Sequence, residues 1–405
     1  MSDIKKKYVI IVGDGMADYP IPQLGDKTPL EVAKTPNMDM LASKGKIGRF
    51  LSIPDGMEPG SDIANMSILG YDPEKYHTGR APIEAASMGI ELDCADVAFR
   101  MNLVCLEFKA DSIIMKSHSA GEISTEEAKK LVDFLQKNMK LPDNIKIYPG
   151  VAYRHILVWK DAPSVKTIPP HDYLEQDLSW YLSDTDNPVV ALIKSSWKLL
   201  KDHPLNRERK KKGLYEANSI WLWGQGKSPR LPSFKDRFGL SGGIISAVDL
   251  IKGLGKLIGL VPIHVEGATG YIDTNYKGKA QKALEFLEDH DFVFIHVEAP
   301  DEAGHNADIE GKIYAIEKID QDVLGVIIDG LSSFDDYAVL VISDHYTPIS
   351  KRTHTAEPAP FACAGKNQLL NKKDSKLLKF CEKEAISSGI VYKGDELILS
   401  FLRCS

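Results

Sequence analysis

Asp344 and His345 are the residues whose type and position most clearly predict chemistry. They follow the β-branched, apolar run Val339–Ile342, separated from it only by Ser343. Such a run predicts a buried strand with two potential metal ligands at its carboxyl end. In open α/β sheets, ligands bind at that edge. Because Asp344 and His345 are adjacent, their side chains leave the strand in different directions and could bind two different metal ions.

Two other predicted strands are followed by residues of the same kind. Asp14 follows the run Tyr8–Val12, and Asp301 and His305 follow the run Phe292–Val297. An Asp after a strand is commonly a turn or helix-capping residue. If residues 301–305 are helical, however, Asp301 and His305 lie on one face and could chelate a single ion.

His354 completes a set of three carboxylates and three imidazoles on loops at one edge of one predicted sheet. Six separate structural roles explain such a set less well than one shared role in metal binding. Oxygen and imidazole ligands without thiolates favour Mn²⁺, Mg²⁺ or Zn²⁺. Six such ligands suit two ions a few ångströms apart, the arrangement used for displacement at phosphoryl groups. The six residues are Asp14, Asp301, His305, Asp344, His345 and His354.

Ser61 is the candidate nucleophile. Gly60 precedes it, Asp62 follows it, and the segment Ile63–Gly70 has helical spacing. Ser61 could be only a helix cap. Alternatively, its hydroxyl meets both the helix N-terminus and a metal ion, and both would lower its pKa and stabilise a phosphorylated serine. The neighbouring set of metal ligands favours the second interpretation.

Strands and helices alternate in the segments that carry these residues, which predicts an α/β fold with a doubly wound, mostly parallel sheet. A further strand is expected at Pro262–Val265. Helices are expected at Leu30–Lys44, with a Thr-Pro start at Thr35–Pro36, and at Gly242–Gly259, Lys277–Asp289 and Lys312–Leu331.

The middle of the chain has a different character and predicts a smaller, inserted α+β domain. Strands are expected at Val97–Leu106, Tyr153–Trp159 and Ile220–Trp223, with a helix at Ser124–Asn138. A chain of 405 residues exceeds what one hydrophobic core usually supports. We therefore expect one discontinuous domain, residues 1–72 and 235–405, and an inserted domain, residues 73–234.

The composition excludes several classes of function. The net charge of -7 argues against a nucleic-acid or anionic-membrane partner. The basic run Arg207–Lys212 is expected to be a solvated loop, with binding of an anionic small molecule as the alternative. The five cysteines are scattered and form no C-x-x-C motif, which fits a reducing cytoplasm and offers no thiolate zinc site. Neither a leader peptide nor a membrane span is expected.

Four motifs together resemble the alkaline phosphatase superfamily and, within it, the archaeal-type cofactor-independent phosphoglycerate mutases. The order and spacing of these motifs make the resemblance specific, and it extends over essentially the whole chain. The motifs are Gly13-Asp14-Gly15-Met16-Ala17-Asp18, Gly60-Ser61-Asp62-Ile63-Ala64-Asn65, Asp301-Glu-Ala-Gly-His305, and Asp344-His345 with His354.

The resemblance implies a two-metal site and a mutase reaction. Ser61 would adjoin or bridge the ion held by Asp14, Asp344 and His345. It would take the phosphoryl group from 3-phosphoglycerate and return it to the 2-hydroxyl, without 2,3-bisphosphoglycerate. Mn²⁺ is the expected metal, with Mg²⁺, Zn²⁺ or Co²⁺ as alternatives. A cleft closed by the inserted domain would exclude water. One ion would be held by Asp301, His305 and His354, and the other by Asp14, Asp344 and His345.

The inserted domain is expected to bind the carboxylate and phosphate of the substrate, since arginine suits bidentate binding of such anions. The segment Trp221–Gly226 is expected to be core and tight turn. The candidate substrate-binding residues are Arg80, His118, Arg154, His155, Asn206, Arg207 and Lys252.

Two other enzymatic functions stay open. The segments Val297–His305 and Gly79–Pro82 look more like a bacterial sister group for which a homoserine kinase role has been proposed. A kinase would need a nucleotide site, and neither a P-loop nor a kinase glycine-rich loop is visible. A metal-dependent phosphomonoesterase is the other alternative, and it requires that water reach the phosphoserine.

Overall fold

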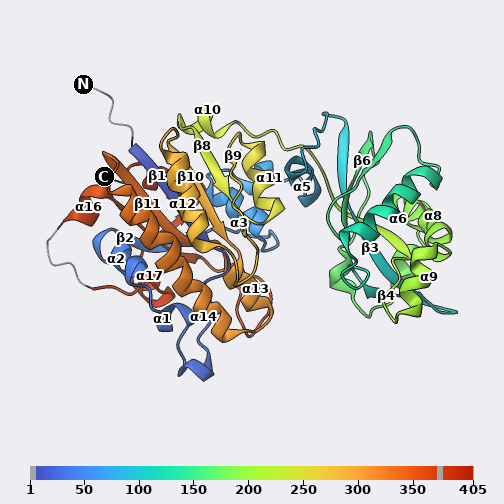
Figure 1. The fold of residues 1–405 in the computed structure, drawn as a ribbon, viewed down its shortest axis with the longest axis horizontal. Helices are drawn as coiled ribbons and strands as arrows, with labels where there is room; N and C mark the ends of the chain where they lie inside the picture. The colour runs from blue at the N-terminus through green and yellow to red at the C-terminus, as the bar shows by residue number, and fades with distance from the viewer. Residues whose placement is uncertain (1–5, 372–376, 405) are drawn as a thin grey trace. The chain divides into compact units, whose positions relative to one another are not determined.

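The computed structural model describes residues 6–371 and 377–404 and divides into two compact units. Unit 1 comprises Met1–His77 and Arg230–Ser405, and unit 2 comprises Thr78–Pro229. The sequence places the corresponding boundaries after residue 72 and before residue 235. Figure 1 shows that the two chain segments of unit 1, blue and yellow to red, lie together. The first five residues, over which no leader peptide is expected, lie outside the described residues.

Unit 1 is built on an eight-stranded sheet in the order β13-β2-β12-β11-β1-β10-β8-β9. All neighbours are parallel except β12, which is antiparallel to both β11 and β2. The predicted mostly parallel sheet is therefore confirmed. The strands are β1 (Lys6–Gly13), β2 (Lys46–Leu51), β8 (Gly242–Ile245), β9 (Val261–Pro262), β10 (Phe292–Val297), β11 (Asp336–Ser343), β12 (Ala359–Gly365) and β13 (Val391–Lys393).

Helices pack on both faces of this sheet, because alternate apolar residues of the central strands point to opposite sides. Val9, Val293 and Val339 share one core with helices α2, α12 and α14. On the other face, Gly255 of α11 packs so closely on Ile244 that a Cβ would lie 2.5 Å from a methyl carbon. The longer helices of unit 1 are α2 (Pro36–Lys44), α3 (Ser61–Ile68), α11 (Asp249–Leu257), α12 (Tyr276–Leu287), α13 (Ala299–His305), α14 (Ile309–Lys318), α15 (Val326–Leu331) and α18 (Glu396–Leu402).

Three sequence-based boundaries in unit 1 were wrong. The expected helix 242–259 begins as strand β8, which pairs with β10, and only residues 249–257 are helical. The expected strand 262–265 pairs only at residues 261–262. The expected helix 30–44 is two helices, α1 (Pro29–Val32) and α2, because the chain is extended at Ala33 and restarts at the Thr-Pro pair. The expected helix 312–331 is confirmed, with a π-helical stretch at Ile319–Gly325.

Unit 2 contains a five-stranded antiparallel sheet around the long strand β3. Strand β3 pairs with β6 on one side and with β7 on the other, and its last residues pair with β4. A large apolar core includes residues of helices α6 and α8, and a smaller one includes residues of α5. The elements are α5 (Arg80–Ser87), β3 (Asp96–Phe108), β4 (Ile113–Ser117), α6 (Thr125–Asn138), β5 (Ile145–Tyr148), β6 (Arg154–Lys160), α8 (Pro188–Lys201), α9 (Pro204–Lys211) and β7 (Ser219–Lys227).

The basic run Arg207–Lys212 is not a loop, as expected, but the end of helix α9. Arg209 is buried because its guanidinium pairs with Glu127 and donates to the carbonyl oxygen of Ala120 at 2.7 Å. Within residues 6–371 and 377–404, no helix is long and apolar enough to cross a membrane.

A fully buried lysine joins the loops that follow β1 and β11. Lys312 Nζ lies 2.6 Å from Asp18 Oδ2 and donates to the carbonyl oxygen of Thr347 at 2.8 Å. Asp18 also accepts hydrogen bonds from the backbone N–H groups of Tyr19 and Ile349. These contacts fix the two loops that continue from the strand ends.

We expect Lys312→Met to lower the free energy of unfolding of unit 1 by about 3–5 kcal/mol, because it leaves the Asp18 carboxylate buried without its cation. Lys318→Met is the matched control in the same helix. Its ion pair with Asp322 is partly exposed, so we expect a change within about 0.5 kcal/mol. Denaturant unfolding followed by circular dichroism measures both, and equal midpoints for the two variants would contradict the prediction.

Candidate active site

Three adjacent parallel strands end level, and the predicted residues follow them. Gly13 of β1 pairs with Val297 of β10 on one side and with Ser343 of β11 on the other. Asp14, Asp344 and His345 therefore leave the sheet at the same edge, and helix α13 begins there. Because β12 runs antiparallel to β11, the loop between them also lies at this edge and carries His354.

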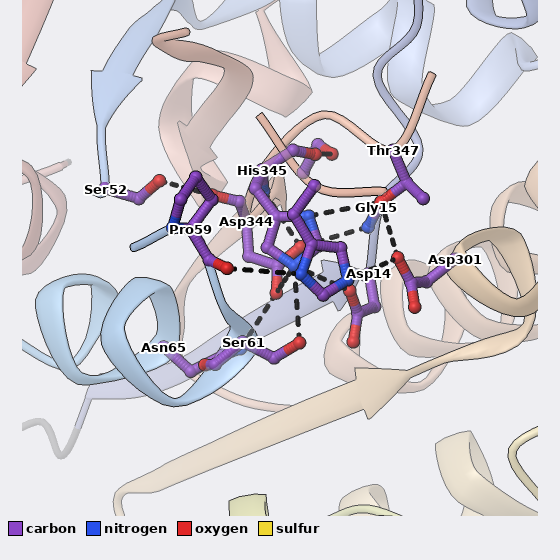
Figure 2. A network of polar contacts seen from close by, with 12 residues as sticks. Asp14, Gly15, Ser52, Pro59, Ser61, Asn65, Asp301, Asp344, His345 and Thr347 are labelled. Atoms are coloured by element: carbon purple, nitrogen blue, oxygen red, sulfur yellow. Dashed lines mark hydrogen bonds and ion pairs between the residues drawn. The ribbon is translucent and has the colours of Figure 1, made fainter. Parts of the chain in front are cut away.

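Asp14, Asp344 and His345 form the first group, and all three are buried. His345 Nε2 lies 3.3 Å from Asp14 Oδ1 and 3.6 Å from Asp344 Oδ2. Ser61 is the first residue of helix α3, and its Oγ lies 3.3 Å from His345 Nε2. Figure 2 shows Ser61, Asp14, Asp344 and His345 converging on one point. The predicted nucleophile thus touches this ligand group.

Asp301, His305 and His354 form the second group. Residues 299–305 are helical, so Asp301 and His305 share one face as the sequence predicts, with His305 Nε2 3.2 Å from Asp301 Oδ2. His354 Nε2 lies 3.3 Å from Asp301 Oδ1 and 3.0 Å from His305 Nε2.

The outer ring nitrogens of the two histidines show why a cation fits between the inner ones. His305 Nδ1 lies 3.0 Å from the carbonyl oxygen of Arg352, and His354 Nδ1 lies 3.4 Å from that of Pro59. A carbonyl oxygen can only accept, so each Nδ1 donates a hydrogen bond and each Nε2 is the nitrogen that could act as a metal ligand. Both Nε2 atoms face each other and Asp301. A metal ion bound between these atoms would have all three residues as ligands.

The charges of the first group also lack a counterpart among the described residues. Burial raises the pKa of Asp14 well above its usual value, and the neighbouring Asp344 carboxylate raises it further. Asp14 Oδ1 is buried and has no hydrogen-bond partner in the described part of the chain. In the second group, a hydrogen bond to Asp301 raises the pKa of His305 to about 9. A bound cation would compensate the buried carboxylates of the first group.

Neighbouring residues orient the ligand carboxylates. Asn65 Nδ2 donates to Asp344 Oδ2 at 2.9 Å and to the Ser61 carbonyl oxygen at 2.8 Å. Thr347 contacts both groups, since its Oγ1 donates to Asp301 Oδ1 and lies 3.3 Å from His345 Nδ1. Gly15 has a φ of +60°, and a Cβ there would lie 2.4 Å from Thr347 Oγ1, so only glycine fits.

His296 is a site neighbour that the sequence analysis missed. It lies within β10, where its only signal was one imidazole in an apolar strand. Burial lowers its pKa to about 4, so the ring is neutral. Its Nε2 lies 3.0 Å from Asp14 Oδ2, and its Nδ1 lies 3.3 Å from Ser246 Oγ. His296 therefore lies against one carboxylate oxygen of Asp14 and His345 against the other.

The predicted substrate-binding residues divide into three groups. Lys252 lies in unit 1, on helix α11, and pairs with Asp249 at 2.7 Å. Arg80, His118 and Arg154 lie in unit 2 and are at least partly exposed.

The remaining three candidates, also in unit 2, are placed less favourably for a ligand. Asn206 is fully buried, and its carboxamide bonds the backbone of Leu200 and Ala217, so we assign it a structural role. His155 is likewise buried and accepts a hydrogen bond from Gly150 N–H. Arg207 is exposed on helix α9.

Comparison with known proteins places the chain in a family. A family profile described as 2,3-bisphosphoglycerate-independent phosphoglycerate mutase matches residues 42–206. A protein of Geobacter sulfurreducens named probable 2,3-bisphosphoglycerate-independent phosphoglycerate mutase is 47% identical over 388 residues, 95% of this chain and 96% of its own length. The mutase of Methanothrix thermoacetophila is 47% identical over 97% of this chain and 98% of its own. The chain belongs to the family of 2,3-bisphosphoglycerate-independent phosphoglycerate mutases.

Solved structures of similar proteins agree with this assignment. A protein of Pyrococcus horikoshii superposes with a TM-score of 0.80 at 31% identity, covering 98% of this chain and 97% of its own. A cofactor-independent phosphoglycerate mutase of Thermoplasma acidophilum superposes with a TM-score of 0.63 at 25% identity, covering 98% and 99%. The mutase family shares the fold described above over essentially the whole chain.

Proposed function

We propose that this protein interconverts 3-phosphoglycerate and 2-phosphoglycerate through a phosphorylated Ser61, independently of 2,3-bisphosphoglycerate. The observation that carries the proposal is the placement of Ser61 Oγ 3.3 Å from His345 Nε2, within the first ligand group. The two relatives described above are named as mutases, and they align with this chain over almost their whole length. Such a reaction is a step of glycolysis and gluconeogenesis, which fits the expected cytoplasmic location.

Two divalent ions would be held by the two ligand groups. Asp14, Asp344 and His345 would hold one, next to Ser61, and the second group would hold the other. Carboxylate and imidazole ligands without thiolates suit Mn²⁺, Mg²⁺, Zn²⁺ or Co²⁺, and of these we propose Mn²⁺. When bound, such ions supply positive charge that stabilises phosphoryl oxygens and lowers the pKa of a nearby hydroxyl.

The residues of the chain itself supply position and polarity. Ser61 begins helix α3, so a phosphoryl group on its Oγ lies at the positive end of the helix dipole. Asn65, one turn later, holds both the Ser61 carbonyl oxygen and Asp344, which fixes the nucleophile relative to the ligand group. The glycerate left after transfer would reorient and accept the phosphoryl group on its 2-hydroxyl. For substrate binding we keep Arg80, His118 and Arg154.

The decisive experiment incubates the metal-loaded protein with 3-phosphoglycerate, without bisphosphoglycerate, and couples 2-phosphoglycerate to enolase. We expect Ser61→Ala to reduce the rate by more than about 10³-fold, because the covalent intermediate cannot form. Metal binding should persist, since six ligands remain. Ser67→Ala in the same helix is the control, because among the described residues that hydroxyl bonds the Ser52 carbonyl oxygen alone.

Three outcomes of that assay would count against the proposal. Retained activity in Ser61→Ala would refute the nucleophile. Release of phosphate without 2-phosphoglycerate would favour a phosphomonoesterase. ATP-dependent phosphorylation of homoserine, with no mutase signal, would favour the kinase alternative.

We expect Asn65→Ala to weaken Mn²⁺ binding at one of two sites by about 10- to 100-fold, because Asp344 loses the amide that orients it. Calorimetric titration of the metal-free protein measures this directly, without reference to activity. Asn306→Ala is the control, since that amide donates only to the Glu302 carbonyl oxygen. Equal affinities in the two variants would show that Asn65 has no such role.

A further inference from the structure

Two cysteines of unit 1 lie in contact although they are distant in sequence. Cys363 is buried in β12, and Cys404 follows helix α18. Their Sγ atoms lie 3.6 Å apart, and 41 positions separate the two residues along the chain. A disulfide requires a distance of about 2 Å, so a small approach of the two sulfur atoms is enough to join them. The fold therefore makes a thiol pair of two cysteines that look scattered in the sequence.

The sheet places a lysine beside this pair. Cys363 lies directly opposite Lys46 of the antiparallel neighbour β2, and residues in that position project from the same face of a sheet. Lys46 Nζ donates hydrogen bonds to the hydroxyl groups of Tyr392, on β13, and Ser400, on α18, both at 2.9 Å. These two bonds hold the ammonium group against the helix that Cys404 follows.

A second lysine approaches Cys404 from strand β1. Lys6 Nζ donates a hydrogen bond to the carbonyl oxygen of Cys404 and forms an ion pair with Asp336 at 3.2 Å. Lys6 is the first residue of β1, and Asp14 follows the last. Cys404 therefore lies toward the edge of the sheet opposite the two ligand groups, so chemistry at its sulfur requires neither a metal ion nor the substrate.

The two sulfur atoms differ in protonation. The hydrogen bond with Cys363 and the charges of Lys46 and Lys6 together outweigh burial and lower the pKa of Cys404 to about 7. The same hydrogen bond and burial raise the pKa of Cys363 well above its usual value. At neutral pH Cys404 is therefore partly thiolate, the reactive form, and Cys363 is the thiol that donates to it.

The two cysteines also differ in access. Cys404 lines a cavity of about 590 Å³ together with Lys46, Tyr392 and Ser400. Cys363 is only 1% exposed. A small, uncharged reagent that enters the cavity therefore meets the sulfur of Cys404, the more reactive of the two.

We propose that Cys404 and Cys363 are a peroxide-sensitive pair that forms a disulfide. The Cys404 thiolate attacks hydrogen peroxide, an S–O bond forms as the O–O bond breaks, and the released hydroxide takes up a proton to become water. The Cys363 sulfur then attacks the Cys404 sulfur, so that an S–S bond forms and the S–O bond breaks. The Cys363 proton leaves with the hydroxyl group as a second water. Two electrons pass from the two sulfur atoms to one peroxide.

The product is a reversible modification. In the reducing cytoplasm expected for this protein, a disulfide is transient, and a dithiol restores both thiols by exchange. The proposal does not depend on the mutase reaction, because the thiol pair contains no residue of either ligand group and does not include Ser61.

The test treats the purified 405-residue protein with one equivalent of hydrogen peroxide and counts thiols after denaturation. We expect a fall from five thiols to three, a peptide linking Cys363 to Cys404 in the digest, and recovery of all five thiols with dithiothreitol. Oxidation of exposed Cys94 alone, without the linked peptide, overturns the proposal.

Three cysteine variants test which sulfur attacks. In Cys363→Ser, dimedone should trap a sulfenic acid on Cys404, because the second thiol is missing. In Cys404→Ser, Cys363 should stay reduced. Cys381→Ser removes a buried thiol outside the pair and should still form the linked peptide. Circular dichroism checks the fold of each variant, and either member of the pair suffices if the other fails to fold. A sulfenic acid on Cys363 in Cys404→Ser would overturn the assigned order.

A lysine variant tests the activation of Cys404. We expect Lys46→Met to slow disulfide formation at pH 7 by about 3- to 10-fold, because the pKa of Cys404 rises and less thiolate is present. Lys282→Met removes an exposed lysine of helix α12 that pairs with Glu285, and it should leave the rate unchanged. Thiol counts at timed intervals measure both rates. Equal rates in the two variants would contradict the activation of Cys404 by its neighbours.

Discussion

The burial of carboxylates at one edge of the unit 1 sheet is the constraint on which the rest of the site depends. Asp14 and Asp344 are buried side by side, and burial with mutual repulsion raises the pKa of Asp14. A buried carboxylate is tolerated only when a cation or N–H donors compensate it. Asn65 and the Gly15 backbone supply part of that compensation for Asp344, and Asp14 Oδ1 stays without a hydrogen bond in the described residues.

The fold around this edge keeps the charged groups at fixed distances. Strands β1, β10 and β11 end level, so residues that are hundreds of positions apart in sequence emerge together. The strand-end loops are then fixed by contacts that are not themselves ligands. Lys312 joins the loops after β1 and β11, and Thr347 contacts one residue of each ligand group. Such supporting contacts set the precision of a site built on loops.

Unit 2 buries a charge of the opposite sign, that of a guanidinium group. There a guanidinium is buried against an indole and shares a single carboxylate with a second arginine. Unit 1 therefore carries buried carboxylates beside Ser61, while unit 2 carries two arginines beside one carboxylate.

The sequence by itself determined the mostly parallel sheet. It also predicted Ser61 and the six residues of the two ligand groups, because apolar strands and the polar residues after them are local patterns. It did not separate a strand from a helix at residues 242–259, since two glycines followed by isoleucines fit both until β10 pairs with them. Only the tertiary structure revealed His296 as a neighbour of the site, because its contact with Asp14 joins residues that are distant in sequence. Tertiary contacts also argue against Asn206 as a substrate-binding residue, because folding brings its carboxamide into hydrogen bonds with the backbone of Leu200 and Ala217.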